Sequence, residues 1–424
     1  MKFRRRFRNA RILTIASMEV FEGEVQVEGN RITYVGEEIH NLDKFFHQTI
    51  DCEKNLLMPG FVNAHTHSGM TFLRSLADDL PLDKWLNEKV FPIETKLTEE
   101  DIYWFCRLAI REYLTSGITS NFDMYLNPYP IIKASQDIGF RTILCGAVND
   151  FTLSVDNVED CFKKYNEKDS LISFKLGFSH EYTTSEDKIK QIAALSHKYK
   201  APVYTHLQET KKEVEECIAH TKKTPLEYLC DLGVFDYGGG GFHLVHMSDR
   251  DIELIEKYHL NVVTNPSSNC KLASGIAPIS DYLKRNINVA LGTDGAASNN
   301  CLDMFREMFL VSALAKIKDQ DASSVDAYEV LRMATINGAK ALGLDCGTLE
   351  EGKLADLILI DLHQPNMLPI NNIAKNIVYS GTKENVLMTM VNGEILYSQG
   401  NYLEDGEEKE IQQRVERLKK GSGI

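Results

Sequence analysis

Apolar runs of strand length alternate with segments of helical periodicity through the middle of the chain. Segments such as Asp101–Leu114, Ser185–His197, Asp249–Tyr258 and Leu302–Ala315 carry apolar residues at three- and four-residue spacing. Such alternation predicts parallel strands joined by right-handed crossovers, and eight units can close into an α/β fold of the (β/α)8 TIM-like barrel type. The predicted strands are Leu57–Ala64, Ile118–Met124, Thr142–Val148, Ile172–Phe178, Val203–Leu207, Gly241–His246, Asn261–Asn265 and Val289–Asp294.

The two ends of the chain show a different pattern, in which apolar and polar residues alternate. This period-two pattern runs from about residue 11 to 52 and again from about 352 to 397, and it predicts antiparallel strands with one buried face. We therefore expect residues 1–58 and 352–405 to form one small β-sandwich domain built from both chain ends, with the barrel at residues 59–351. The mixed-charge tail at 406–424 predicts a solvated helix.

Composition narrows the classes of partner and the compartment. The 424 residues are 43% hydrophobic and 25% charged, which is ordinary globular usage. The net charge of -14 argues against nucleic acid or an anionic membrane as a partner, and no stretch approaches the roughly 20 apolar residues that span a bilayer. The basic start is followed by no long apolar run, and nine scattered cysteines without a Cys-x-x-Cys pair indicate reduced thiols. We expect a cytoplasmic protein.

Two histidines end the first predicted barrel strand. His65 and His67 follow an apolar run and are separated by one residue. Side chains at positions i and i+2 of a strand point to the same face, so two neutral imidazoles can converge on one cation. The pair therefore predicts a metal site at the carboxyl ends of the strands, where barrels of this kind place their chemistry.

Three further strand ends carry the same kinds of ligand. His206 lies near the end of the fifth strand with Glu209 three residues on, His243 lies in the sixth strand and Asp294 ends the eighth. Imidazole and carboxylate are ligands that zinc accepts, and a catalytic zinc keeps one position open for water. Each residue also has a plainer interpretation: a surface histidine, a helix-start carboxylate, a buried polar group and a turn or cap residue, respectively. Their shared position after strands favours the metal site.

Four consecutive glycines, Gly238–Gly241, precede the sixth strand. A phosphate-binding loop would continue with Gly-Lys-Ser/Thr into a helix, and neither follows here. We therefore expect a flexible turn at this point.

These residues resemble a known family. The motifs look like those of the amidohydrolase superfamily, within the branch that holds S-adenosylhomocysteine and methylthioadenosine deaminases, guanine deaminase and s-triazine chlorohydrolases. The Asp294 segment and the residues after His67 most resemble adenosine-type deaminases. The segments that carry the likeness are His65-Thr66-His67, Met70–Arg74 with Ala77–Leu80, Thr205-His206 with Glu209, Phe242–His246, Gly292–Asn300 and Gly347–Leu357.

The resemblance implies one divalent metal ion, which we expect to be Zn2+, although Fe2+, Ni2+ and Mn2+ accept the same ligands. Superfamily members with two metals often add a lysine from the fourth strand. Lys175 lies in that strand five residues before His180, so period-two alternation places the two on opposite faces, and we expect a mononuclear centre. The implied metal ligands are His65, His67, His206 and Asp294.

The resemblance also assigns the catalytic groups. Glu209 is implied to carry a proton from the attacking water to the ring and then to the departing amine. His243 and Asp294 are implied to hold or orient the new oxygen. The sequence therefore predicts three catalytic residues: Glu209, His243 and Asp294.

The implied substrate contacts are Trp85, Glu94 and His180, with Glu209. Trp85 and Glu94 match positions that bind the ribose in nucleoside deaminases. Trp85 is equally compatible with packing on the barrel and Glu94 with a solvated helix face. Arg74 is expected to form a structural ion pair.

The resulting hypothesis is a metal-dependent hydrolytic deaminase with a small-molecule substrate, acting on adenosine-type nucleosides and releasing ammonia and the inosine-type product. The nearest alternative is a guanine, pterin or s-triazine substrate acted on by the same catalytic residues; a cyclic-amide hydrolase and a structural protein without catalysis are further alternatives.

No arginine occurs between Arg141 and Arg250, so a carboxylate tail on the substrate would lack a guanidinium partner. We therefore expect adenosine, 5′-deoxyadenosine and methylthioadenosine to be preferred over S-adenosylhomocysteine. The oligomeric state is left open, a homo-oligomer included.

Overall fold

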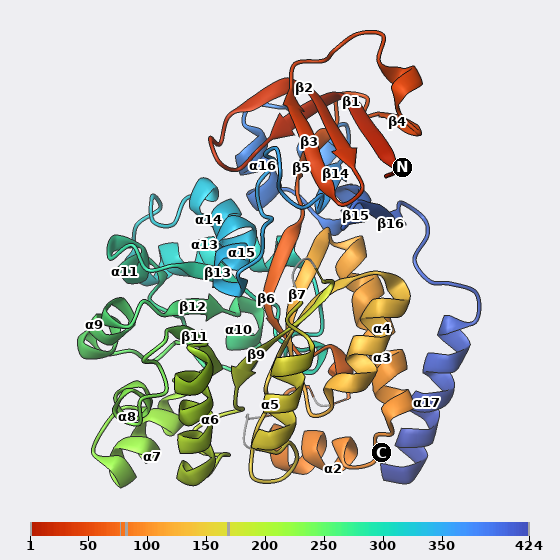
Figure 1. Ribbon diagram of the computed structural model, residues 1–424. Helices are drawn as coiled ribbons and strands as arrows, with labels where there is room; N and C mark the ends of the chain where they lie inside the picture. Colours follow the sequence, from red (N-terminus) through yellow and green to blue (C-terminus); the bar gives the residue numbers. More distant parts are fainter. Residues whose placement is uncertain (1, 77, 81–83, 168–169, 423–424) are drawn as a thin grey trace.

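A sheet of eight parallel strands forms the centre of the molecule (Figure 1). The computed structural model describes residues 2–76, 78–80, 84–167 and 170–422. The strands follow one another in sequence order around the sheet, as expected for a (β/α)8 barrel. They are β6 (Phe61–Thr66), β7 (Ile118–Met124), β8 (Arg141–Cys145), β9 (Ile172–Gly177), β10 (Val203–Leu207), β11 (Gly239–His243), β12 (Asn261–Thr264) and β13 (Val289–Leu291).

Backbone contacts between the segment after β13 and the first strand β6 close the barrel. The amide of Asp294 donates a hydrogen bond to the carbonyl of His65 at 3.0 Å. One residue earlier, the amide of Thr293 donates to the side-chain oxygen of Asn63 at 2.9 Å. The ends of the first and last strands, and the side chains at those ends, therefore lie side by side.

The first predicted strand is two strands. β5 (Leu56–Pro59) pairs in the smaller sheet, and β6 begins the barrel after Gly60. A Cβ at Gly60 would lie 2.1 Å from Thr119, so only glycine allows the chain to cross between the sheets here. Because both halves are apolar and buried, the hydrophobic pattern alone could not locate the break.

The glycine run before the sixth strand is mostly strand, whereas the sequence predicted a flexible turn. β11 starts at Gly239, two residues earlier than expected. A Cβ at Gly239 would lie 1.9 Å from the carbonyl oxygen of Val203, and one at Gly240 would lie 2.4 Å from that of Asn261. The glycines therefore permit close approach of the neighbouring strands β10 and β12.

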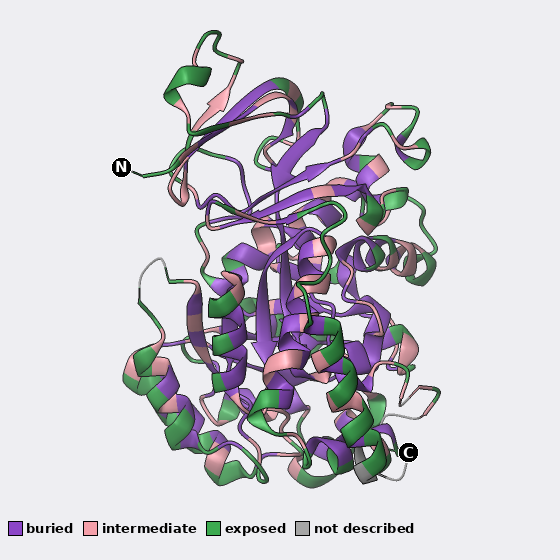
Figure 2. Cartoon of the chain, turned by 90° about the vertical axis from the view of Figure 1, so that its right-hand side faces the viewer, coloured by how far each residue is buried: buried purple, intermediate pink, exposed green. Residues whose placement is uncertain are grey.

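Helices surround the barrel, with their buried faces towards the strands (Figure 2). The N-terminus of α3 is fixed by a capping box in which Thr98 and Asp101 bond to each other's backbone amides. No helix in the described part of the chain is long and apolar enough to cross a membrane. The helices between Phe91 and Leu342 are α2 (Phe91–Glu94), α3 (Glu99–Thr115), α4 (Pro128–Ile138), α5 (Val155–Lys164), α6 (Glu186–Tyr199), α7 (Lys211–Thr221), α8 (Pro225–Asp231), α9 (Asp249–Lys257), α10 (Pro266–Lys271), α11 (Ile279–Lys284), α12 (Ala296–Asn299), α13 (Met304–Asp319), α14 (Ala327–Ala334) and α15 (Ile336–Leu342), with the short turns η2 (Ser68–Leu73) and η3 (Trp85–Val90) after β6.

Strands from both chain ends form a second, mixed sheet beside the barrel. The expectation that its strands run antiparallel is wrong in part, because β1 pairs in parallel with β4 and β5. A buried cluster that includes Phe7, Leu57 and Leu357 forms its core. The members are β1 (Arg4–Leu13), β2 (Val20–Glu28), β3 (Arg31–Gly36), β4 (Gln48–Asp51), β5, β14 (Leu357–Ile360), β15 (Val386–Val391) and β16 (Glu394–Ser398), with η1 (Asp43–Phe45), η4 (Pro365–Met367), α16 (Ile373–Tyr379) and η5 (Lys383–Asn385) between them.

The C-terminal tail is helical, but it is not fully solvated as the sequence suggested. Helix α17 (Glu407–Ser422) lies along α3, with its end near α2 (Figure 1). Ile411 and Leu418 on its inner face are buried. The charged residues that dominate its composition hide this narrow apolar stripe.

A buried ion pair joins the barrel to the mixed sheet. The guanidinium of Arg141, at the start of β8, donates to both oxygens of Asp356 at 2.8 and 3.2 Å. Asp356 also accepts the backbone amide of Asn392 at 2.6 Å. Both charged side chains are essentially inaccessible to water.

We expect Arg141→Met to destabilise the protein by about 3 to 5 kcal/mol, because it leaves the carboxylate of Asp356 buried without its partner. The free energy of unfolding in urea measures the effect. The exposed pair of Lys133 and Asp137 supplies the control, since Lys133→Met should leave the unfolding midpoint unchanged. Equal shifts in the two variants would show that the buried pair does not hold the two sheets together.

Candidate metal centre and active-site pocket

The four predicted metal ligands converge at the carboxyl ends of the barrel strands. Nε2 of His65 and Nε2 of His67 lie 3.5 and 3.1 Å from Oδ1 of Asp294. Nε2 of His206 lies 3.3 Å from Nε2 of His67. Such separations are those of atoms that share one cation, and they place β6, β10 and the end of β13 around a single point.

Hydrogen bonds on the far sides of His67, His206 and Asp294 leave one nitrogen or oxygen atom of each residue free to bind a metal. His67 and His206 direct Nδ1 at the carbonyl oxygens of Met124 and Ser179, which leaves Nε2 as the lone-pair atom in each ring. Oδ2 of Asp294 accepts two serine hydroxyls, so Oδ1 faces the other ligands. Those hydroxyls come from Ser268 and Ser298, each at 2.6 Å.

His65 provides an independent test of whether a metal fits. Its ring is fully buried and stacks on Phe242 with ring centroids 3.7 Å apart. Neither ring nitrogen has a hydrogen-bond partner among the residues that the structure describes. A buried polar atom without a partner is costly, and a cation between His65 and Asp294 would satisfy it.

The protonation states of the ligands suit a divalent cation. Burial lowers the pKa of His65 to about 3 and the pKa of His206 well below its ordinary value, so both rings are neutral. Burial alone would raise the pKa of Asp294, but the imidazoles of His65 and His67 beside its carboxylate hold that pKa well below its usual range. Burial would lower the pKa of His67, but Asp294 raises it to about 9. A proton on His67 therefore balances the carboxylate, and a metal ion would displace it.

Glu209 lies beside this cluster and does not serve as the helix cap. Its Oε1 accepts the hydroxyl of Ser274 at 3.0 Å and lies 3.8 Å from Nδ1 of His243. Thr210 caps α7, with Glu213 as the other member of the capping box, and the carboxylate of Glu213 accepts the amide of Glu209 at 2.8 Å. His243 is held in turn by Asn269, with Nδ1 2.8 Å from the amide oxygen. The carboxylate of Glu209 is thus free to face the pocket.

A pocket of about 530 Å³ opens above the metal ligands. All four predicted substrate contacts line it: Trp85, Glu94, His180 and Glu209. His180 stacks on His206 with ring centroids 4.2 Å apart, and burial lowers its pKa to about 3. Burial raises the pKa of Glu94 to about 7, against the opposing effect of the Tyr125 hydroxyl.

Several polar residues of the site carried no recognisable sequence signal. Tyr125 follows β7 and faces Glu94, and Ser274 bonds to Glu209. Ser268 and Ser298 orient Asp294. All four lie in segments that follow barrel strands, Ser268 in α10 and Ser298 in α12, so position after a strand was the available clue. The sequence contains many polar residues in such positions.

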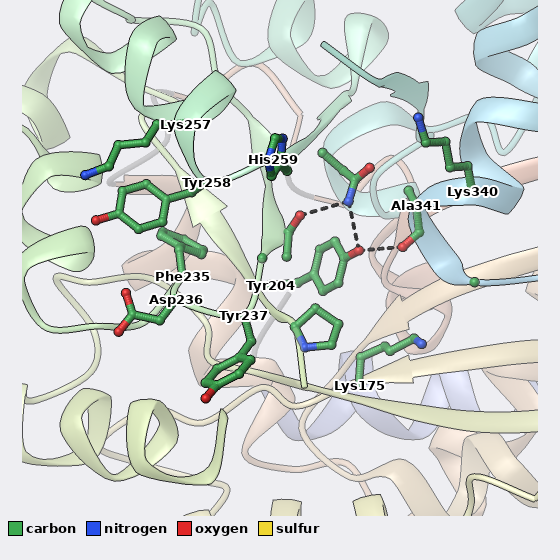
Figure 3. A pocket seen from close by; sticks show the side chains of 15 residues that line it. Lys175, Tyr204, Phe235, Asp236, Tyr237, Lys257, Tyr258, His259, Lys340 and Ala341 are labelled. Carbon is green, nitrogen blue, oxygen red and sulfur yellow. Dashed lines mark hydrogen bonds between the residues drawn. The ribbon is translucent and has the colours of Figure 1, made fainter. Parts of the chain in front are cut away.

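Lys175 does not face the metal centre. It lines a second hollow of about 520 Å³ where β10, β11 and β12 begin, together with Tyr204 and Gly239 (Figure 3). None of the metal-ligand candidates lines this hollow. The expectation that Lys175 points away from His180 is confirmed. Arg74 also behaves as expected, since its guanidinium pairs with Glu112.

Comparison with known proteins points to the same family as the sequence motifs. A model of the amidohydrolase family matches residues 56–396. The chain is similar to the 5-methylthioadenosine/S-adenosylhomocysteine deaminase of Thermoanaerobacter pseudethanolicus, at 40% identity over 88% of both chains. It is also similar to the 5′-deoxyadenosine deaminase of Methanothermobacter thermautotrophicus, at 38% identity over 93% of both chains.

A solved structure extends the likeness to the whole fold. The adenosine deaminase from Xanthomonas campestris with bound zinc aligns with a TM-score of 0.91 and 29% identity, over 99% of this chain and 98% of that one. The matched region contains the histidines of β6, the loop of Glu209 and the end of β13. The chain therefore belongs to the amidohydrolase family.

Proposed function

We propose that this protein is a zinc-dependent hydrolase that deaminates adenosine-type nucleosides to the inosine-type product and ammonia. The observation that carries the proposal is the buried carboxylate of Glu209 beside His243, next to the converging ligand candidates His65, His67, His206 and Asp294, at the base of a pocket of about 530 Å³. Three imidazoles and one carboxylate form a ligand set that suits zinc, because two of the imidazoles are neutral and a metal would displace the proton of the third. The zinc bound to the related adenosine deaminase also supports this choice.

The chemistry demands an activated water and two protonations. An aromatic amine is a poor leaving group, so the ring nitrogen and then the amine must each receive a proton. A bound Zn2+ supplies the nucleophile by lowering the pKa of its water towards about 7. Glu209, oriented by Ser274, would carry the first proton of the water to the ring nitrogen. After attack it would carry the second proton, from the new hydroxyl group, to the departing amine. His243 bonds through Nδ1 to Asn269, which leaves Nε2 to orient the attacking oxygen.

Glu94 favours a nucleoside over a free base. Its Oε1 is buried, lines the pocket and has no hydrogen-bond partner among the described residues. A ribose diol would supply two donors to this carboxylate. Trp85, buried on the same segment, offers a flat apolar surface beside it. These two side chains are the proposed ribose contacts.

We expect Glu209→Gln to lower kcat by about 10² to 10⁴ while the protein keeps its metal, because the proton carrier lies outside the ligand set. His206→Ala should lose both metal and activity. Elemental analysis and ammonia release on the two purified variants separate the roles. Turnover of Glu209→Gln close to that of the wild type would rule out its assignment.

Substitution of Glu94 tests the ribose contact. Glu94→Gln should lower kcat/KM for adenosine by about 10- to 100-fold, since charge-assisted hydrogen bonds contribute about 1.5 to 3 kcal/mol. The free base adenine lacks the diol and serves as the matched control substrate. If both substrates lost efficiency equally, Glu94 would not contact the ribose.

The same carboxylate predicts a pH dependence. Because the pKa of Glu94 is raised to about 7, the carboxylate gains its proton as the pH falls through 7. KM for adenosine should therefore rise below pH 7 in the wild type. The Glu94→Gln variant has no ionisable group at position 94, so its KM for adenosine should not rise below pH 7.

The pocket also predicts which 5′ groups are accepted. Among the described residues that line it, none is lysine or arginine. A carboxylate tail would therefore find no cationic partner, and we expect S-adenosylhomocysteine to have a kcat/KM about tenfold below that of methylthioadenosine, equivalent to about 1.4 kcal/mol. Phe151 stands exposed at the pocket rim. Phe151→Arg should raise kcat/KM for S-adenosylhomocysteine without raising it for methylthioadenosine. A higher kcat/KM of the wild-type protein for S-adenosylhomocysteine than for methylthioadenosine would contradict the argument.

A further inference from the structure

The C-terminal helix packs on the segment that carries the proposed ribose contacts. Ile411, Val415 and Leu418 lie at i, i+4 and i+7, which is one face of a helix. They belong to the same apolar cluster as Trp85 and Ile93, the neighbour of Glu94. This is a continuous packed layer from the last helix of the chain to the wall of the pocket.

Ion pairs fix α17 near its start. Arg107 and Arg111 project from α3 towards the residues that begin the helix. Nε of Arg107 bonds to Glu407 at 2.8 Å, and Nε of Arg111 bonds to the same carboxylate at 3.1 Å. Arg107 also reaches Glu404 at 2.9 Å. The Arg107 and Glu407 side chains are almost fully buried, so this contact is part of the interior.

A second group of ion pairs fixes the helix further along. Arg414 pairs with Glu100 at 2.5 Å, and Arg417 pairs with Asp101. Asp101 is also the residue whose carboxylate accepts the amide of Thr98 at 2.7 Å and caps α3. Arg417 therefore contacts the point at which the chain leaves α2 and enters α3.

The segment held in this way has little stability of its own. η3 is six residues of π-helix and α2 is a single turn of four residues. Isolated helices of this length do not form in water, so their position must come from packing. These two turns and the residue that follows them contribute four residues to the lining of the pocket: Trp85, Phe91, Glu94 and Thr95.

We propose that α17 is a strap that positions the η3–α2 segment, and that it thereby sets the affinity for the nucleoside while leaving the metal centre untouched. The functional part of this inference rests on the proposed nucleoside deaminase activity. None of the metal-ligand candidates belongs to the apolar cluster that α17 joins. Loosening the strap should therefore affect substrate binding and not metal binding.

The two tryptophans of the chain allow a test that does not depend on activity. Trp104 lies on α3, and Trp85 lies on η3. In a Trp104→Phe background, fluorescence comes from Trp85 alone. The strap is loosened by Ile411→Ala with Leu418→Ala. The matched control is Gln412→Ala with Glu416→Ala on the exposed face of the same helix.

In the loosened variant we expect acrylamide quenching of Trp85 to rise at least about twofold, KM for adenosine to rise about tenfold, kcat to change much less and metal content to stay at the wild-type value. The control pair should match the parent in all four measurements. Should the loosened variant fail to fold, Arg417→Ala removes one anchor more gently and should shift quenching and KM in the same directions.

Unchanged quenching of Trp85 would overturn the proposal whatever the kinetics show. Increased quenching with an unchanged KM would overturn the link to substrate binding. If no variant and no wild-type enzyme deaminates any nucleoside, the proposed activity fails, while the quenching result still decides whether α17 positions the segment.

Discussion

Closure of the barrel between its first and last strands is the constraint on which the site depends. The bond from the amide of Asp294 to the carbonyl of His65 ties together two backbone positions that each carry a proposed ligand. A Cβ at Gly292 would lie 2.8 Å from the backbone nitrogen of His65, so the glycine permits this approach. The spacing of the ligands is therefore set by main-chain contacts, which are stiffer than side-chain rotamers.

A second network places the acid–base group relative to those ligands. Gln208, with φ of +51°, turns the chain sharply between His206 and Glu209. Its carbonyl accepts the amides of Val245 and His246 at 3.0 Å each, and its own amide donates to Glu213 at 2.6 Å. The loops after β10 and β11 are thus joined, so Glu209 and His243 are located by one set of bonds.

The parts of the fold that follow from periodicity were predictable from the sequence. The alternation of strand-like and helix-like patterns predicted the barrel, and the carboxyl ends of its strands indicated where His65, His206 and Asp294 would meet. The break at Gly60 was not visible because apolar residues continue on both sides. The roles of Glu209 and of the substrate contacts were inferred from the resemblance to a family. Spacing alone was equally compatible with Glu209 as a carboxylate at the start of a helix.

Tertiary contacts account for what the sequence could not reveal. Ser268 and Ser274 contact Asp294 and Glu209 only because the chain that follows β12 lies beside these residues, whereas Ser298 reaches Asp294 from the short helix α12 that follows it. His243 and Asp294 adopt φ values of +76° and +56°, which non-glycine residues rarely do and which no local pattern announces. The buried stripe of α17 is equally hidden, because three apolar positions are spread over a highly charged helix.

The location of α17 has a consequence for how the protein is made. The turns that carry Trp85 and Glu94 leave the ribosome before His206 and Asp294, whereas the helix that packs on them follows all of these residues in the chain. Chains fold from the N-terminus as they emerge, at about 5 to 20 residues per second. The proposed metal ligands, all of which precede α17 in the chain, can therefore assemble before the proposed ribose contacts settle. A nascent or clipped chain that lacks α17 would then hold its metal without a finished nucleoside pocket.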